Sequence, residues 1–360
     1  MSDPSLQLQR ELESSITAAL TARRPILSHI NADTTWLLSL PYPEDAICPP
    51  RRCRFNILLD PWLVGPQIDV AGWFSKQWHT IQSSVQTIEE LNDVLYEREK
   101  LELHALERRT RKSSEDHDTA GPDAGNYIDA VICSHEFADH CHRKTLEEID
   151  TSVPCFATTK AAKLIRSWGH FKQVLDIFPF GKGSDWRQTS TPPLPPWIGI
   201  ARLVTESDAL YFHSAVAVFA RDTRSLHRYG AEAIIYSPHG IHSPDLVSIP
   251  TATPPIQTLA MLHGLHEVSI SFTKHSFTKQ LNLGAINALK CQRLLQAKYW
   301  AGTHDEAKIG GGLVAPFLRR KTYTLQDAVK AQVRDDAVTI LPTDNINYIE
   351  MLSGESLLLE

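Results

Sequence analysis

Residues 133–142 read CSHEFADHCH and place three imidazoles and two carboxylates in one short segment. The segment directly follows the apolar run YIDAVI at 127–132, which is typical of a buried strand. Imidazole nitrogen and carboxylate oxygen suit zinc and similar divalent metals, and a catalytic zinc site uses three protein ligands and a water. The segment therefore predicts part of a metal site at a strand end, with further ligands supplied by other strands.

Three later apolar segments each contain an isolated histidine that could complete such a site. These segments are LYFHSAV with His213, IIYSPHGIH with His239 and YWAGTHDE with His304. The alternative is that the same side chains form a buried hydrogen-bond network, or that His239 is only a residue of the Ser-Pro-His-Gly turn.

The order of these motifs resembles that of the metallo-β-lactamase superfamily. VICSHEFADH is similar to the family signature H-x-H-x-D-H, in which His135, Asp139 and His140 match and Phe137 stands in place of the second histidine. FHSAVAVF resembles the segment of the central metal-binding histidine, AEAIIYSPHG takes the place of the strand that ends in a bridging aspartate, and AGTHDE resembles the segment of the final histidine. NILLDPWLVG resembles the early strand and Asp-Pro turn of the branch with ascorbate-phosphate lactonases and phospholipase D-like enzymes. The resemblance extends over about residues 34–311.

The family usually binds two metals, and one of its two sites is incomplete in this sequence. That site uses the first, second and third histidines of the pattern. Phe137 therefore leaves only His135 and His213 for it, fewer than the three protein ligands of a catalytic zinc site. These two histidines are expected to form a weaker second site or to donate protons.

The other family site is matched residue by residue. The resemblance implies that Asp139, His140 and His304 are metal ligands and that Asp139 also orients the attacking water. The bridging aspartate is absent, and His239 is the nearest substitute, as a fourth ligand or as an acid. We therefore expect one well-formed site, with zinc as the first choice and manganese or iron as alternatives.

A divalent metal in such a site favours hydrolysis, because it lowers the pKa of a bound water to about 7 and polarises the oxygen under attack. We predict a metallo-hydrolase that acts on an ester, lactone, thioester or phosphoester of a small molecule, with Asp139, His239 and His135 in catalytic roles. Two other classes of protein stay open. A mononuclear iron oxygenase could use the same kind of two-histidine, one-carboxylate set, and a binding protein could keep the fold around a decayed metal centre.

The elements that must position these residues follow from the apolar patterns and the turn signals. Strands are expected at 34–40, 54–65, 127–134, 153–158, 198–205, 209–220, 231–240, 297–306 and 337–342. Helices are expected at 87–107, 142–149, 159–169, 257–267, 283–297 and 324–335. This alternation is typical of layered α/β folds. Together with the resemblance it predicts a four-layer αβ/βα sandwich with mixed sheets.

The domain plan is an N-terminal amphipathic helix extension over residues 1–30 and a single domain over 31–350. The polar, Gly- and Ser-containing segment at about 108–126 is predicted to be a mobile insertion. The two histidines at 263 and 266 lie on the predicted helix 257–267 without the H-E-x-x-H pattern, so helix packing explains them.

Two further residues near the predicted site have expected roles. His142 begins a predicted helix and is expected to face solvent. Asp60 lies in the Asp-Pro turn and is expected to support the site without binding metal.

Composition limits the partners of the protein. The formal net charge is −6, and the basic residues are scattered, which is not the pattern of a protein that binds nucleic acid or an anionic membrane. The six cysteines form no C-x-x-C pair, and the N-terminus lacks the basic start and apolar core of a secretory signal. We expect a cytoplasmic protein with a small-molecule substrate, and the sequence sets no oligomeric state.

Overall fold

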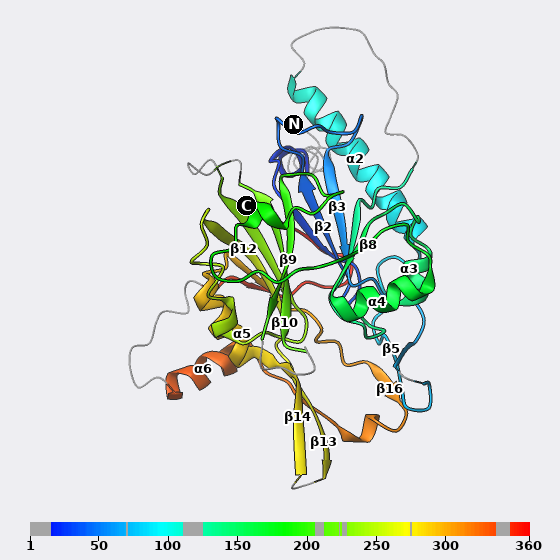
Figure 1. Ribbon diagram of the computed structural model, residues 1–360, viewed down its shortest axis with the longest axis vertical. Coiled ribbons are helices and arrows are strands. Elements are labelled where there is room, and N and C mark those ends of the chain that lie inside the picture. The colour runs from blue at the N-terminus through cyan, green and yellow to red at the C-terminus, as the bar shows by residue number, and fades with distance from the viewer. Residues whose placement is uncertain are drawn as a thin grey trace, which may run out of the picture.

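The computed structural model describes residues 16–69, 71–110, 125–205, 212–222, 224, 229–273, 276–335 and 346–360. In this part of the chain, two large mixed sheets pack face to face, with helices on their outer sides (Figure 1). The layers therefore run helix, sheet, sheet, helix.

The first sheet has seven strands in the order β19-β1-β2-β3-β6-β7-β8. Its strands are β1 (Ile26–His29), β2 (Trp36–Pro41), β3 (Arg54–Leu59), β6 (Ala130–Cys133), β7 (Cys155–Ala157), β8 (Val174–Asp176) and β19 (Ser356–Leu358). The strands from β3 to β8 are parallel, and β1, β2 and β19 are antiparallel to their neighbours. The helices outside this sheet are α2 (Ile88–Thr110), α3 (Arg143–Glu147) and α4 (Thr159–Trp168).

The second sheet has six strands in the order β18-β15-β12-β11-β10-β9. Its strands are β9 (Ile198–Val204), β10 (Ser214–Arg221), β11 (Ala231–Ser237), β12 (Ile256–His263), β15 (Tyr299–Ala301) and β18 (Tyr348–Ile349). Outside it lie α5 (Gly284–Leu295) and α6 (Leu325–Asp335). The strands from β11 to β18 are parallel, so their carboxyl ends meet at one edge of the sheet.

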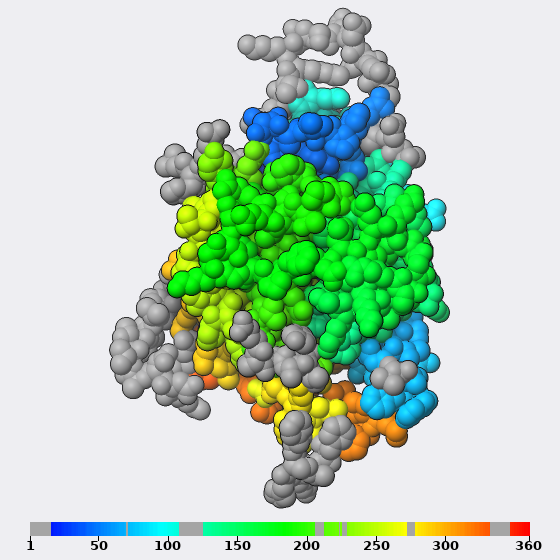
Figure 2. Space-filling view, viewed as in Figure 1, coloured from blue at the N-terminus to red at the C-terminus, as the bar shows by residue number. Residues whose placement is uncertain are grey.

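Two three-stranded sheets lie at the lower end of the molecule in Figure 1. One consists of β13 (Glu267–Thr273), β14 (Ser276–Leu283) and β17 (Leu318–Lys321), and the other of β4 (Gln67–Asp69), β5 (Ser75–Trp78) and β16 (Ile309–Gly311). The short 3-10 helices are η1 (Trp186–Thr189), η2 (Ser243–Leu246) and η3 (Ala315–Phe317). In the space-filling view the yellow, orange and light-blue segments gather at this end, although they are far apart in the sequence (Figure 2).

Strand alternation distributes the apolar side chains between the layers. In β3, Ile57 packs between the two sheets, whereas its neighbour Leu58 packs against the helices outside the first sheet. In β10, Val218 packs between the sheets and Phe219 packs toward α5. Both faces of each sheet are thus buried, which explains the continuous apolar runs in the sequence.

The predicted helix at 257–267 is wrong, because residues 256–263 form β12 and β13 begins at Glu267. β12 lies in the middle of the second sheet between β11 and β15, and its side chains are buried on both faces. A strand of this kind has no period-two alternation, so periodicity alone cannot distinguish it from a buried helix.

The sheet also extends beyond the predicted domain boundaries of 31 and 350. Ile26–His29, assigned to the N-terminal extension, form β1, and Ser356–Leu358 form β19 beside it. Residues 1–15, the predicted strand at 337–342 and most of the predicted insertion at 108–126 lie outside the described residues. Within the described part of the chain, no helix is both long and apolar enough to cross a bilayer.

Candidate metal centre

Five of the six predicted ligands meet at the carboxyl ends of strands. His135, Asp139 and His140 lie in the turn after β6. His239 follows β11, and His304 follows β15. All five side chains are buried, and open α/β sheets commonly gather functional groups at this edge.

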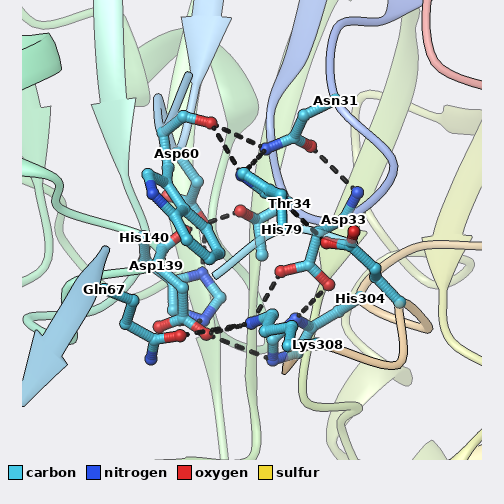
Figure 3. Close-up of polar contacts among 12 residues, drawn as sticks. Asn31, Asp33, Thr34, Asp60, Gln67, His79, Asp139, His140, His304 and Lys308 are labelled. Carbon is cyan, nitrogen blue, oxygen red and sulfur yellow. Dashed lines mark hydrogen bonds and ion pairs between the residues drawn. The ribbon is translucent and has the colours of Figure 1, made fainter. Parts of the chain in front are cut away.

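Asp60 orients His140 in the way expected of a supporting residue (Figure 3). The Nδ1–H of His140 donates to Oδ2 of Asp60 at 2.6 Å. The backbone N–H of Ser134 and the hydroxyl of Tyr236 also donate to this carboxylate, at 2.6 and 2.7 Å. A carboxylate that holds Nδ1 in this way leaves the Nε2 lone pair of the histidine free to bind a metal.

His239 and His304 are also oriented by hydrogen bonds at Nδ1, with acceptors from other elements. The Nδ1–H of His239 donates to Oδ1 of Asn282 in β14 at 3.0 Å, and the Nδ1–H of His304 donates to Oδ1 of Asp33 at 3.0 Å. His304 has a left-handed backbone conformation, with φ of 59°. A non-glycine residue in this region is strained, and such strain concentrates at functional sites.

The three imidazoles converge on one point. The potential ligand atoms of His140, His239 and His304 all lie within 4.8 Å of one another. The rings of His140 and His239 lie 4.8 Å apart, and those of His239 and His304 lie 4.9 Å apart. The Nε2 atoms of His140 and His239 are buried without a hydrogen-bond partner. Because an unpaired buried nitrogen costs free energy, this donor set fits a divalent metal that would bind those atoms.

His135 and His213 are the two predicted histidine ligands outside this group. The ring of His135 is 4.8 Å from that of His239 and 5.4 Å from that of His140, and its Nε2 also has no hydrogen-bond partner. His213 instead contacts His242, with ring centroids 5.3 Å apart. Among the described residues, neither His135 nor His213 belongs to a group of three ligands within 4.8 Å, so their metal role stays a prediction.

Phe137, which replaces the second histidine of the family pattern, packs against other rings. It stacks on Phe212 with centroids 5.2 Å apart and on His135 with centroids 5.8 Å apart. The aromatic side chain therefore forms part of an apolar wall beside the imidazoles.

Asp139 faces the centre but is bound to a lysine that the sequence analysis did not identify. Nζ of Lys308 lies 2.8 Å from Oδ2 of Asp139 and 2.7 Å from Oδ2 of Asp33 (Figure 3). Oδ2 of Asp139 lies 3.7 Å from Nε2 of His304. Asp33, Asp139 and His304 form a second group whose ligand atoms lie within 4.8 Å of one another.

Burial keeps two of the histidines neutral. It lowers the pKa of His239 well below the usual histidine value, and the neighbouring His135 and His140 lower it further. Burial, followed by the charge of His140, has the same effect on the pKa of His135. Both side chains are therefore neutral at neutral pH, which is the form that binds metal.

Neighbouring charges outweigh burial in setting the pKa values of His140 and Asp139. Burial acts to lower the pKa of His140, but the carboxylates of Asp139 and Asp60 outweigh it and the pKa is raised. Burial acts to raise the pKa of Asp139, but Lys308, His140 and other cations outweigh it and the pKa is lowered well below the usual range. Asp139 is therefore ionised, and a metal at Nε2 of His140 competes with a proton.

A cavity of about 580 Å³ opens onto this centre. Its walls are mainly apolar and come from the loop after β4, the β13–β14 hairpin and the segment around η3. The apolar lining residues are Phe74, Phe137, Phe212, Val268, Ile270, Leu281, Leu313, Val314, Phe317 and Leu318. Asp139, His239, His304 and Lys308 also line it. The size is within the usual range for a small-molecule pocket.

Sequence reasoning missed Asp33, Asn282 and Lys308. Asp33 lies in the turn between β1 and β2, and Asn282 lies in a hairpin that has no counterpart in the quoted motifs. Lys308 comes shortly after His304 in the sequence. This closeness to a predicted ligand was the one feature that could have identified it as a site residue.

Two expectations about other histidines are corrected by the structure. His142 caps α3 as expected, but it is 5% exposed and its Nδ1 contacts Oγ1 of Thr145 at 2.9 Å, so it does not face solvent. His263 is the last residue of β12 rather than part of a helix.

The comparisons with known proteins agree with this architecture. No protein-family model matches the chain, and no curated protein matches it. The isothiocyanate hydrolase from Delia radicum gut bacteria is 14% identical, with 93% of this chain and 99% of that chain covered and a TM-score of 0.50. A possible metal-dependent hydrolase from Veillonella parvula DSM 2008 is 13% identical, with 93% and 100% covered and a TM-score of 0.50. The metallo-β-lactamase fold protein YhfI from Bacillus subtilis is 10% identical, with 92% and 99% covered and a TM-score of 0.41.

Likeness at this level of identity shows the fold. The chain has two mixed sheets between outer helices, in an αβ/βα sandwich of the metallo-β-lactamase type. The fold expected from the sequence is thus confirmed, and its strand ends carry a cluster of histidines and aspartates able to hold a divalent metal.

Proposed function

We propose that this protein is a metal-dependent hydrolase whose metal, with zinc as the first choice, is held by His140, His239 and His304. One observation carries the proposal. Each of these imidazoles donates its Nδ1–H to a buried acceptor, the potential ligand atoms of all three lie within 4.8 Å of one another, and Nε2 of His140 and of His239 has no hydrogen-bond partner. A purely structural histidine cluster would have partners on both nitrogens, because an unpaired buried nitrogen is costly.

A divalent metal bound there would supply Lewis acidity and a water of lowered pKa. The residues of the chain then have separate tasks. Asp139 is ionised and accepts a hydrogen bond from the attacking water, which orients it. His135, neutral and with a buried Nε2 that has no hydrogen-bond partner, lies beside the ligand trio and can accept a hydrogen bond from the substrate or from water. His239, predicted as a fourth ligand or an acid, takes the ligand role because Asn282 fixes it with Nε2 toward the centre.

The apolar cavity narrows the substrate class. Its walls suit the uncharged body of a carboxylic ester, a lactone or a thioester, with the reactive carbonyl near His304. A phosphoester is a poorer candidate. Lys308 is already paired with two carboxylates, and Arg320 lies exposed at the rim.

Metal content and hydrolysis measured on the same preparations test this proposal. The purified chain should contain zinc by elemental analysis and hydrolyse apolar 4-nitrophenyl esters. A chelator should abolish the activity, and added zinc should restore it. His239→Ala should lose both the metal and the activity, whereas His104→Ala, on the exposed side of α2, should keep both. A His239→Ala protein with full metal content, or a wild-type protein that binds no added metal, would contradict the proposal.

The same experiment separates the hydrolase from an iron oxygenase. An oxygenase centre of the two-histidine, one-carboxylate type would need a free carboxylate beside two imidazoles. The third imidazole of His239 and the pairing of Asp139 with Lys308 favour the hydrolase. Iron in the purified protein together with oxygen consumption would reverse this preference.

A further inference from the structure

Among the described residues two groups could hold a metal ion, and Lys308 occupies the second of them. This group consists of Asp33, Asp139 and His304, and it shares His304 with the three-histidine group. Nζ of Lys308 lies 2.7 Å from Oδ2 of Asp33 and 2.8 Å from Oδ2 of Asp139. Figure 3 shows the ammonium group between these two carboxylates.

The surroundings of Lys308 hold its ammonium in this position. The side chain is 6% exposed, and Nζ lies 5.1 Å from the centroid of the Trp62 ring. Trp62 is fully buried and is itself held against His79, with ring centroids 3.7 Å apart. A lysine ammonium is a compact point charge, and desolvation against an aromatic face strengthens its attraction to that face.

One metal ion and Lys308 match the charge of the carboxylates that contact or face the ligand histidines. Three buried carboxylates contact or face the ligand histidines, namely Asp33, Asp60 and Asp139. One ammonium and one divalent cation supply three positive charges against these three negative charges. A second divalent cation between Asp33 and Asp139 would lie against the ammonium, and repulsion between two like charges in a buried site is strongly unfavourable.

We propose that Lys308 is a built-in cation that takes the place of a second metal ion, so that the centre holds one metal at the three imidazoles. This inference rests on the proposed metal centre and specifies its stoichiometry. The ammonium neutralises Asp33 and Asp139, and Asp33 in turn holds His304. Lys308 therefore acts as a positioning residue for one metal ligand and for the carboxylate that orients water.

Metal counting on a lysine variant tests the assignment. Wild-type protein dialysed after exposure to excess zinc should retain about one equivalent, because the chain offers one complete set of ligands. Lys308→Met keeps the length of the side chain and removes its charge, so Asp33 and Asp139 become available and the retained zinc should rise to about two equivalents. Lys163→Met, on the exposed face of α4, is the matched control and should stay at the wild-type value.

A double variant shows whether the gained ion uses the proposed carboxylates. Asp33→Asn combined with Lys308→Met removes one charge of each sign, so the centre stays balanced. It should return to about one equivalent, since amide oxygen is a weaker zinc ligand than carboxylate. If Lys308→Met is insoluble, electron paramagnetic resonance of manganese-loaded wild-type protein decides instead. The spectrum of an isolated ion supports the proposal, and that of a coupled ion pair overturns it.

The outcomes separate this inference from the proposed function. About two equivalents in the wild type, or no gain in soluble Lys308→Met, would overturn the role of Lys308 while leaving the metal centre intact. A wild type that retains no metal under any loading condition would overturn the metal centre itself, and with it the role of Lys308.

Discussion

Two buried sites in this protein differ in how completely the central side chain of each is paired. In the first, Arg54 at the start of β3 has a partner for each guanidinium nitrogen. Nε donates to Glu102 at 2.6 Å, Nη1 to the carbonyl of Arg24 at 2.6 Å and Nη2 to the carbonyl of Leu20 at 3.4 Å. In the second, His140 and His239 use one ring nitrogen each and leave the other without a partner.

Under the proposed function, this difference separates a side chain that stabilises the fold from imidazoles that bind a ligand. When a buried charge makes all its hydrogen bonds, they offset the free energy lost in removing it from water. If one partner is removed, the other stays buried without that compensation. Unpaired ring nitrogens behave in the opposite way. The free-energy cost of burying them is removed only when a ligand binds, so the ligand stabilises the folded state. The predictions below test this distinction.

The largest expected effect on stability comes from Arg54→Met. The variant leaves the carboxylate of Glu102 buried without its cation, so we expect a loss of roughly 3–5 kcal/mol in the free energy of unfolding, measured by urea denaturation. The metal content of the folded fraction should not change. Arg143→Met breaks the exposed pair with Glu147 and should have a much smaller effect. Equal effects of the two variants would contradict the distinction.

His263 is a histidine of the fully paired kind, and it predicts a pH dependence. Its Nδ1–H donates to the carbonyl of Gly264 at 2.9 Å, and its Nε2 lies 3.1 Å from Nδ2 of Asn287. Burial lowers its pKa from 6.5 to about 4. Because the folded-state pKa is below the unfolded value, the stabilisation is present above pH 6.5 and is lost as the pH falls toward 4, by roughly 3 kcal/mol in total.

The measurement is urea unfolding of chelator-treated protein at several pH values. His263→Gln should flatten the loss between pH 6.5 and 4 relative to the wild type. His104→Gln, at an exposed position of α2, should leave the profile unchanged. If both variants keep the wild-type slope, His263 does not carry the effect.

His304→Ala should weaken zinc binding by at least about a hundredfold, because loss of a ligand costs more than loss of the groups that orient ligands. Competition with a chromophoric chelator measures the change in Kd. The same variant should lower the melting temperature of the zinc-loaded form more than that of the zinc-free form, since metal binding is coupled to folding. In this experiment His263→Gln is the control. Zinc loss in the control and retention in His304→Ala would exchange the roles assigned to the two histidines.

Asp60→Asn should have the smallest of these effects, a loss of about tenfold to a hundredfold in zinc affinity. The amide can still accept from Nδ1 of His140, but it lacks the charge that favours one tautomer. Asp45→Asn, at an exposed carboxylate bound to Arg221, should bind zinc like the wild type. An Asp60→Asn protein with wild-type affinity would show that Asp60 stabilises the fold without preparing His140.

Local patterns in the sequence were enough to predict the layered α/β class, most of the elements and the first part of the site. The run at 127–132 followed by three histidines predicted a strand and a metal-binding turn because both signals lie within a few residues. The helix predicted at 283–297 corresponds to α5, whereas the helix predicted at 257–267 is the strand β12. Periodicity failed there because burial on both faces removes the alternation that marks a strand.

Only the tertiary structure decided which side chains complete the centre. Asp33 and Lys308 are separated by most of the chain, and they meet because β1, β2 and β15 bring their turns to the same edge of the two sheets. The hydrogen-bond acceptor of His239 comes from a hairpin with no recognisable motif. A sequence shows which chemical groups are present. Whether a histidine has one partner or two, and whether a carboxylate faces a metal or an ammonium, depends on distances between elements that only packing of the layers sets.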